Sequence, residues 1–317
     1  MITKTEKSIP ASRLLTIPAM MGAAFFMMST QAMAQSSVNI YGGISLALTK
    51  ATGSSTAINT TGFGNYVGFR GAEDLGGGLT AYFDMRSNFD ADTGALSGGP
   101  GAVLWGEKSF VGLRGSFGSV QLGRFLNAYD DVSFKAFGET VASERGLPYS
   151  GRDNNMLGYY SPDFGGFTFA ATTSFKEGVA TNGKVGSFNL RYANGPVALG
   201  VAHESASSKV GVMHNSTLVG GSYDFGVAKF LTDYAKASKG SNESNLRMGV
   251  SVPMGAGALK AAFTKGRNNG NTFDRQIGLG YWYNLSKRTL LFADVNSTRR
   301  PGTGSTTAFD LGINHNF

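Results

Sequence analysis

The chain has 317 residues, with 28 Lys and Arg against 21 Asp and Glu, so its formal net charge is +7. The excess is mild and contains no run of like charge, and cysteine is absent, so we expect no nucleic-acid partner, no metal site and no cofactor. A glycine count of 46 with 12% aromatic residues and 8 prolines is typical of many glycine-punctuated strands, and it argues against collagen, coiled coil and disorder.

The first 34 residues have the pattern of a signal peptide. A basic start (Lys4, Lys7 and Arg13) precedes an apolar stretch at residues 14–28, and Ala-Met-Ala at 32–34 matches a cleavage site. An uncleaved membrane anchor fits less well, because the apolar stretch is only about 15 residues long and contains Pro18, whereas a spanning helix needs roughly 20. We therefore predict a signal peptide at 1–34 and a mature domain at 35–317.

Alternation of apolar and polar residues recurs along the predicted mature chain. In its last segment one parity carries Phe309, Leu311, Ile313 and Phe317, and the other carries Asp310, Gly312, Asn314 and Asn316. Similar alternation occurs at residues 38–49, 79–86 and 276–285. This pattern fits strands with one face toward lipid and one toward water. A soluble β-sandwich also alternates, so the spacing of the turns must separate the two folds.

Short turn signals alternate with longer polar segments. Short turns are predicted at 73–78, 116–118, 162–166, 194–196, 223–226, 253–257 and 285–288, and longer segments are centred near 54, 98, 138, 181, 208, 240, 270 and 304. Short periplasmic turns and long extracellular loops are typical of outer-membrane barrels. The turns and the terminal segments together predict an all-β, transmembrane antiparallel β-barrel of 16 strands, embedded in the lipid bilayer of the cell outer membrane.

Several motifs in this order resemble the general Gram-negative porin family, in particular its trimeric sixteen-stranded branch of β-proteobacterial type. The matching stretches are residues 38–42, 68–79, 110–113, 122–124, 159–167, 191–196 and 283–289, together with the final Phe317. The resemblance implies passive diffusion of small hydrophilic solutes and ions through a homotrimer of water-filled pores. It also implies a third loop folded into each lumen, and a terminal Phe317 that the outer-membrane assembly machinery reads as an assembly signal.

Candidate constriction residues follow from this resemblance. The third long segment, residues 125–153, carries the acids Asp130, Asp131, Glu139 and Glu144, which would face a basic wall. On that wall Arg70, Arg124 and Arg152 occupy basic positions of the family's motifs, and Arg86 shares the inward parity. Arg124 has the parity of the lipid-facing Leu122, so it reaches the lumen only if the chain bulges near Gly123 or the strand has already ended.

The sequence also departs from the family pattern at the expected constriction. Tyr66 and Glu107 stand where relatives usually carry arginine. Because these changes remove expected positive charge, and because Asp130 and Asp131 favour cations, we expect at most a weak anion preference.

Other functions remain as alternatives. A barrel enzyme would need histidine or paired carboxylates in a cleft, but His203 and His315 have lipid-facing parity and His214 lies in a predicted loop, so we expect no catalytic residues. A substrate-selective outer-membrane channel would need aromatic residues lining the lumen, which one sequence does not reveal. An adhesin would use the exposed loops, which carry no motif for it.

Overall fold

The computed structural model describes residues 37–98, 101–137, 140–144, 146, 151–175, 183–207, 214–239 and 242–317. They belong to one compact unit, Ala34–Phe317. None of these residues lies in a helix with the length and hydrophobicity of a membrane span. The signal peptide predicted at 1–34 and the loop acid Glu139 fall outside the described residues, so both stay predictions.

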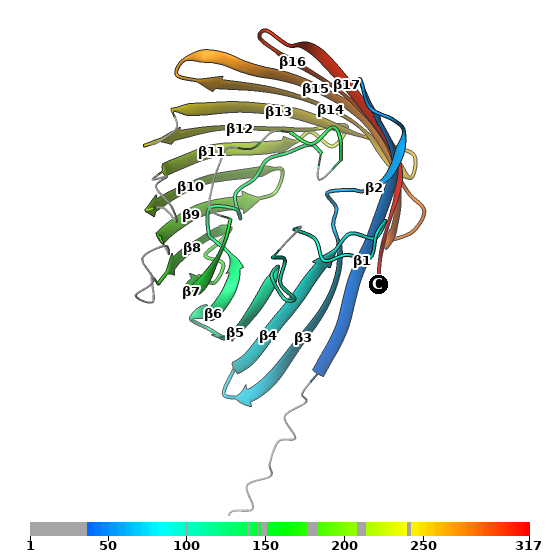
Figure 1. Ribbon diagram of the computed structural model, residues 1–317. Helices are drawn as coiled ribbons and strands as arrows, with labels where there is room; N and C mark the ends of the chain where they lie inside the picture. The colour runs from blue at the N-terminus through cyan, green and yellow to red at the C-terminus, as the bar shows by residue number, and fades with distance from the viewer. Residues whose placement is uncertain are drawn as a thin grey trace, which may run out of the picture. The chain divides into compact units, whose positions relative to one another are not determined.

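The described residues form seventeen β-strands in one continuous sheet (Figure 1). In chain order they are β1 Ser37–Ala51, β2 Ala57–Thr60, β3 Asn65–Gly76, β4 Leu79–Phe89, β5 Lys108–Gly115, β6 Gly118–Leu126, β7 Arg152–Tyr160, β8 Phe167–Ser174, β9 Lys184–Asn194, β10 Val197–Ser207, β11 His214–Asp224, β12 Lys229–Ser238, β13 Glu243–Met254, β14 Gly257–Asn268, β15 Asn271–Asn284, β16 Thr289–Arg300 and β17 Gly304–Asn316. Consecutive strands from β3 onward pair antiparallel, and β1 pairs with β17. The sheet therefore closes on itself, and none of the described strands leaves a free edge in the bilayer.

Seventeen strands make a sixteen-stranded barrel because β2 and β3 are two pieces of one barrel strand. Both pieces pair with β1: β2 pairs along residues 46–49 and β3 along residues 37–43. Between them the ring of Phe63 packs 5.0 Å from Trp282 and 5.3 Å from Phe292, measured between ring centroids. The prediction of a sixteen-stranded antiparallel barrel is confirmed.

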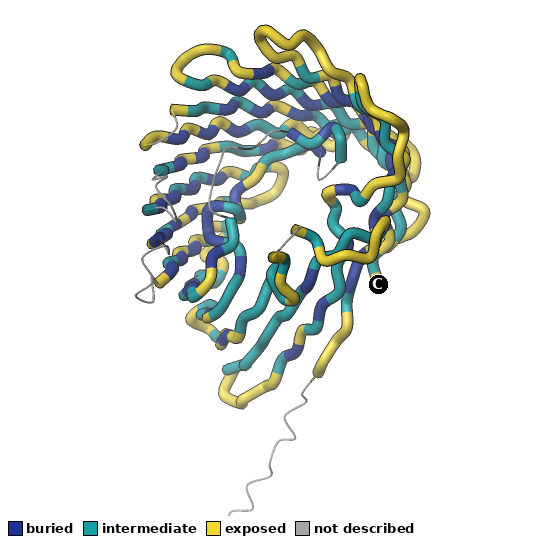
Figure 2. The backbone as a smooth tube through the Cα atoms, viewed as in Figure 1, coloured by how far each residue is buried: buried dark blue, intermediate teal, exposed yellow. Residues whose placement is uncertain are grey.

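The two faces of the barrel wall differ in polarity, as the alternation predicted. In β17, Asp310 is 3% exposed, while its neighbour Leu311 is 59% exposed. Figure 2 shows this alternation of buried and exposed residues along most strands. The inward parity carries mainly polar or small side chains, and the outward parity carries most of the exposed large apolar ones. A closed sheet with an apolar exterior is a transmembrane barrel and not a sandwich of two sheets.

The loops at the extracellular rim are shorter than predicted near β14–β17. Asn268 pairs with Asn271, and Arg300 pairs with Gly304, so the segments near residues 270 and 304 are tight turns. The polar residues around these turns belong to strands and not to loops. They lengthen β14–β17 to 12–14 residues, which is more than a bilayer requires. The longest connections are residues 90–107 and 127–151.

Candidate pore constriction

The connection between β6 and β7, residues 127–151, is called loop L3 here, and it folds into the barrel (Figure 1). Its base is closed by a hydrogen bond from Asn127 N to Gly151 O, 2.9 Å. Along the loop, Phe134 N donates to Asp233 Oδ2 at 3.1 Å, and Val141 N donates to Asp310 Oδ2 at 3.0 Å. These partners lie on β12 and β17, so L3 follows the inner wall across that half of the barrel. The predicted inward third loop is confirmed.

Glycines on the inner wall make room for L3. An added Cβ at Gly249 would lie 2.5 Å from Ala136 Cβ, and one at Gly200 would lie 2.8 Å from Val132 Cγ1. Gly220 and Gly278 approach the loop in the same way, at 2.7 Å from Phe134 and 3.0 Å from Ala142. Glycine within a strand often marks a close approach of another segment. We call these four glycines the glycine seat of L3.

Glu144 braces L3 from within. Its carboxylate accepts hydrogen bonds from Ala136 N at 2.6 Å and from Phe137 N at 3.1 Å. Burial raises the pKa of Glu144, although these backbone hydrogen bonds oppose the shift. The carboxylate is thus hydrogen-bonded within its own loop, and the charge of Arg247 on β13 also favours its ionised form.

Two further acids of L3, Asp130 and Asp131, lie beside strands β9 and β13. Asp131 accepts a hydrogen bond from Asn189 Nδ2 at 3.2 Å and feels the charge of Arg191, an inward arginine that the sequence analysis did not single out. Desolvation raises the pKa of Asp131 to about 6. Asp130 borders a small cavity that Lys135 and Arg247 also line. The structure therefore brings both acids together with basic residues of their own side of the lumen.

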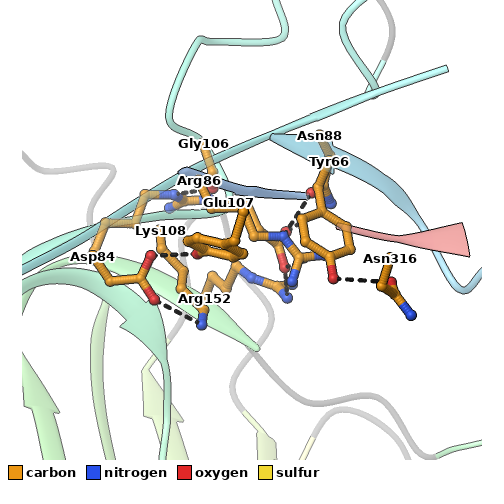
Figure 3. Close-up of polar contacts among 11 residues, drawn as sticks. Tyr66, Asp84, Arg86, Asn88, Gly106, Glu107, Lys108, Arg152 and Asn316 are labelled. Atoms are coloured by element: carbon orange, nitrogen blue, oxygen red, sulfur yellow. Dashed lines mark hydrogen bonds and ion pairs between the residues drawn. The ribbon is translucent and has the colours of Figure 1, made fainter. Parts of the chain in front are cut away.

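A cluster of charged and polar residues lies on the wall of β3–β7 (Figure 3). Glu107 is its centre: its carboxylate accepts a hydrogen bond from Arg152, another from Asn88 Nδ2 at 3.0 Å, and lies 3.9 Å from Arg86 Nη2. The Arg86 guanidinium stacks over the ring of Tyr66, 3.6 Å from the centroid. These five residues are called the Glu107 cluster. It brings together three of the predicted residues, Tyr66, Arg86 and Arg152, around Glu107. The sequence analysis noted Glu107 only as a position where relatives usually carry arginine.

A second ion pair adjoins the Glu107 cluster. Lys108 Nζ lies 3.3 Å from Asp84 Oδ2, and the hydroxyl of Tyr41 donates to the other oxygen of that carboxylate. Lys108 and Tyr41 were not among the predicted site residues. Their inward parity was readable from the alternation, but the pairing depends on side chains that meet across three strands.

Arg124 joins this region through a bulge. The pairing of β6 with β7 shifts between Gly123 and Phe125, and Gly123 has a φ of 138°. The guanidinium of Arg124 then donates to Gly106 O at 2.6 Å and to Asn154 Oδ1 at 2.7 Å. The bulge near Gly123, on which the sequence analysis made the position of Arg124 depend, is present. The Arg124 side chain ends beside Gly106, the residue before Glu107.

Arg70 and Phe317 lie elsewhere. Arg70 faces the lumen beneath the ring of Tyr41, at 5.0 Å from its centroid, on the far side of Tyr41 from the Glu107 cluster. Phe317 lies at the closing seam, where its N–H donates to Gly42 O at 3.0 Å and its carbonyl accepts from Gly42 N at 3.1 Å.

A closed sixteen-stranded barrel with an apolar exterior, a polar interior and an inward loop defines a transmembrane diffusion channel of the porin class. The model of the Gram-negative porin family matches residues 19–303. The chain belongs to this family, and it forms a water-filled channel in the outer membrane for passive diffusion of small hydrophilic solutes and ions.

Characterised relatives agree with this assignment. The chain is 33% identical over 302 residues to outer membrane porin protein 32 of Delftia acidovorans, covering 84% of this chain and 85% of the relative. It is 27% identical over 333 residues to an outer membrane porin protein of Bordetella pertussis, covering 82% and 84%. Among solved structures, the anion-selective porin from Comamonas acidovorans matches with a TM-score of 0.80 and 26% identity over 89% of this chain and 100% of that one.

Proposed function

We propose that L3 and the Glu107 cluster together form the narrowest part of the pore and give it a weak anion preference. The observation that carries this proposal is an excess of positive charge on the wall opposite L3. Arg86, Lys108 and Arg152 carry three positive charges there, against the two carboxylates of Asp84 and Glu107. Arg124 donates a hydrogen bond to the carbonyl of Gly106, the residue before Glu107, and adds a fourth positive charge.

Charges at a narrow, partly desolvated passage act on ions more strongly than charges on outer loops, which salt screens within roughly 8–10 Å. The preference is expected to be weak, because Glu107 neutralises part of the arginine charge and Asp131 supports cations from the loop side. The solved relative described as an anion-selective porin supports the same sign.

The test is the reversal potential of the purified channel in a KCl gradient. Arg152→Ser should move this potential toward cations, and Asp131→Asn should move it toward anions. Reversal potentials and conductances unchanged in both variants would place the narrowest point elsewhere and overturn the proposal.

We further propose a homotrimer, as in the trimer form in which the related barrel OmpT of Vibrio cholerae was solved. Crosslinking of the protein in native membranes would test the trimer. A channel of this kind needs no catalytic residue. His203 and His315 bond to threonines at 2.8 and 2.9 Å. His214 is the first residue of β11 and not part of a loop, and it bonds to Glu204 at 2.7 Å.

A further inference from the structure

A second group of arginines lies in the lumen on the periplasmic side of the Glu107 cluster. Arg70 and Arg114 both border one pocket of about 360 Å³, whose inward side chains also include Asn39, Tyr82, Asp84 and Phe110. Arg114 is the penultimate residue of β5, beside a short periplasmic turn. The pocket is at the small end of ligand sites in proteins, which suits a small molecule and not a polymer.

The two arginines are held in place but not neutralised. Each guanidinium lies over a tyrosine of the adjacent strand: Arg70 at 5.0 Å from the ring centroid of Tyr41, and Arg114 at 5.5 Å from that of Tyr82. Arg86 stacks on Tyr66 in the same way, so three consecutive strands repeat the arrangement. Within the described part of the chain, however, only Arg86 of these three has an acidic partner within 4.0 Å.

Asp84, the acid that lines the pocket, already has partners. Asp84 accepts from Tyr41 and pairs with Lys108 at 3.3 Å. Its negative charge is therefore balanced from the constriction side, and the charges of Arg70 and Arg114 remain available to an anion. Both arginines are exposed to the lumen, so their N–H groups can donate to an incoming oxyanion.

The pocket also has an apolar side. The ring of Phe110 packs edge-on against Tyr82, with centroids 6.0 Å apart and an interplanar angle of 80°. Phe110 and Tyr82 thereby offer aromatic surface within the same pocket as the two guanidinium groups.

We propose that this pocket is a binding subsite for small organic oxyanions that carry a flat apolar ring, with Arg70 and Arg114 holding the anionic group and Phe110 and Tyr82 contacting the ring. The site rests on the channel function, but it does not depend on which ions the constriction prefers. A solute held there would occupy the pore at lower concentrations, while the direction of its passive net flux would still follow its concentration gradient.

Single-channel recording tests the subsite with benzoate as the probe and acetate as the ringless control. In the wild-type channel, benzoate added to KCl should lower the unitary conductance with a saturating dose dependence, while acetate at equal concentration should not. The double substitution Arg70→Gln with Arg114→Gln should raise the half-effect concentration of benzoate by at least about tenfold, because the loss of even one charge-assisted hydrogen bond has about that effect. Arg288→Gln, which removes an exposed arginine from a periplasmic turn, should leave it unchanged.

A second variant separates ring contact from charge. Phe110→Leu keeps both arginines and should also weaken the benzoate effect. Equal effects of benzoate and acetate on the wild type, or equal benzoate responses in the arginine double variant and the Arg288 control, would overturn the subsite. A wrong sign of the reversal potential in KCl alone would count against the anion preference and leave the benzoate result standing.

Discussion

The carboxylate of Glu107 is hydrogen-bonded to the guanidinium of Arg152, so a residue that reduces the positive charge of the wall also holds one of its arginines in place. The same acid also orients Asn88 and lies within reach of Arg86. Glu107 therefore lowers the positive charge of the wall and fixes the geometry of its arginines.

Replacing Glu107 by Gln should raise the anion preference. The amide keeps the shape of the side chain and part of its hydrogen bonding, but it releases the charge of Arg86 and Arg152. The measurement is the reversal potential in a KCl gradient. Glu73→Gln, at an exposed position near the periplasmic end of β3, serves as the control, and an equal shift in both variants would mean that Glu107 does not act on the ion path.

The ion preference should depend on pH through Asp131. Burial raises the pKa of this group from 3.8 to about 6, so it carries its charge at pH 7 and is mainly neutral at pH 5. Acidification should therefore shift the reversal potential toward anions. Because the folded pKa is the higher one, the contribution of Asp131 to stability also increases as the pH falls from 7 through 6 toward 4.

Asp131→Asn isolates this effect from the titration of histidines. The wild type and the variant should differ at pH 7.5 and converge at pH 5. A constant difference between them at both pH values would show that Asp131 does not titrate in this range.

Filling the glycine seat should displace L3 from the wall and change the size of the pore. In Gly249→Val the new Cβ would lie 2.5 Å from Ala136 Cβ, so L3 must move away from the wall or the wall must bend. We expect an altered, more variable unitary conductance and a less stable barrel. Gly186→Val is the matched control, because a Cβ there meets nothing within 4 Å. A wild-type conductance in Gly249→Val would contradict the role of L3 in setting the pore size.

Charge should be tolerated on one face of the wall and not on the other. Leu311→Arg places a guanidinium in the hydrocarbon and should cost about 2–4 kcal/mol of unfolding free energy if the site lies near the bilayer midplane. Asn39→Arg places the same group in the lumen, where water reaches it, and should cost much less. Denaturant titration of the barrel in lipid vesicles compares the two, and equal costs would contradict the assignment of the faces.

Phe317 should matter more for delivery than for the finished barrel. Phe317→Ala keeps the two backbone hydrogen bonds to Gly42 and removes the ring. We expect slower appearance of the variant in the outer membrane of cells, with nearly unchanged stability of the refolded protein. Phe309→Ala, which removes an outward aromatic ring within β17, should be delivered at the wild-type rate. Equal delivery of both variants would show that the ring has no special role in assembly.

The fold was predictable because alternation and turn spacing are local properties of the sequence. Asp310 and Leu311 reveal their faces through their neighbours alone, and Gly123 marked the bulge that redirects Arg124. The contacts of the site are not local. Whether Asp131 meets Arg191 or Arg86 depends on the path of L3 across a lumen that no short-range pattern describes.

The glycine seat illustrates the same limit. Gly200 and Gly249 have the parity of the lumen, but a missing side chain there is equally compatible with open water. Their meaning appears only when Val132 and Ala136 are placed against them. Similarly, the distinction between Arg86, which has an acidic partner, and Arg70, which has none within the described residues, depends on where Glu107 lies across the sheet.

The division of the lumen into a wall covered by L3 and an open wall has a consequence for how this protein can evolve. Along β10–β17 the interior is packed like a protein core, so a substitution there must fit its neighbours, as Gly249 does. The wall of β3–β7 is not covered by L3, so exchanges such as arginine for Tyr66 or Glu107 change the local charge cluster but require no change in the loop. Lineages can therefore retune which solutes pass while inheriting the same barrel and the same loop unchanged.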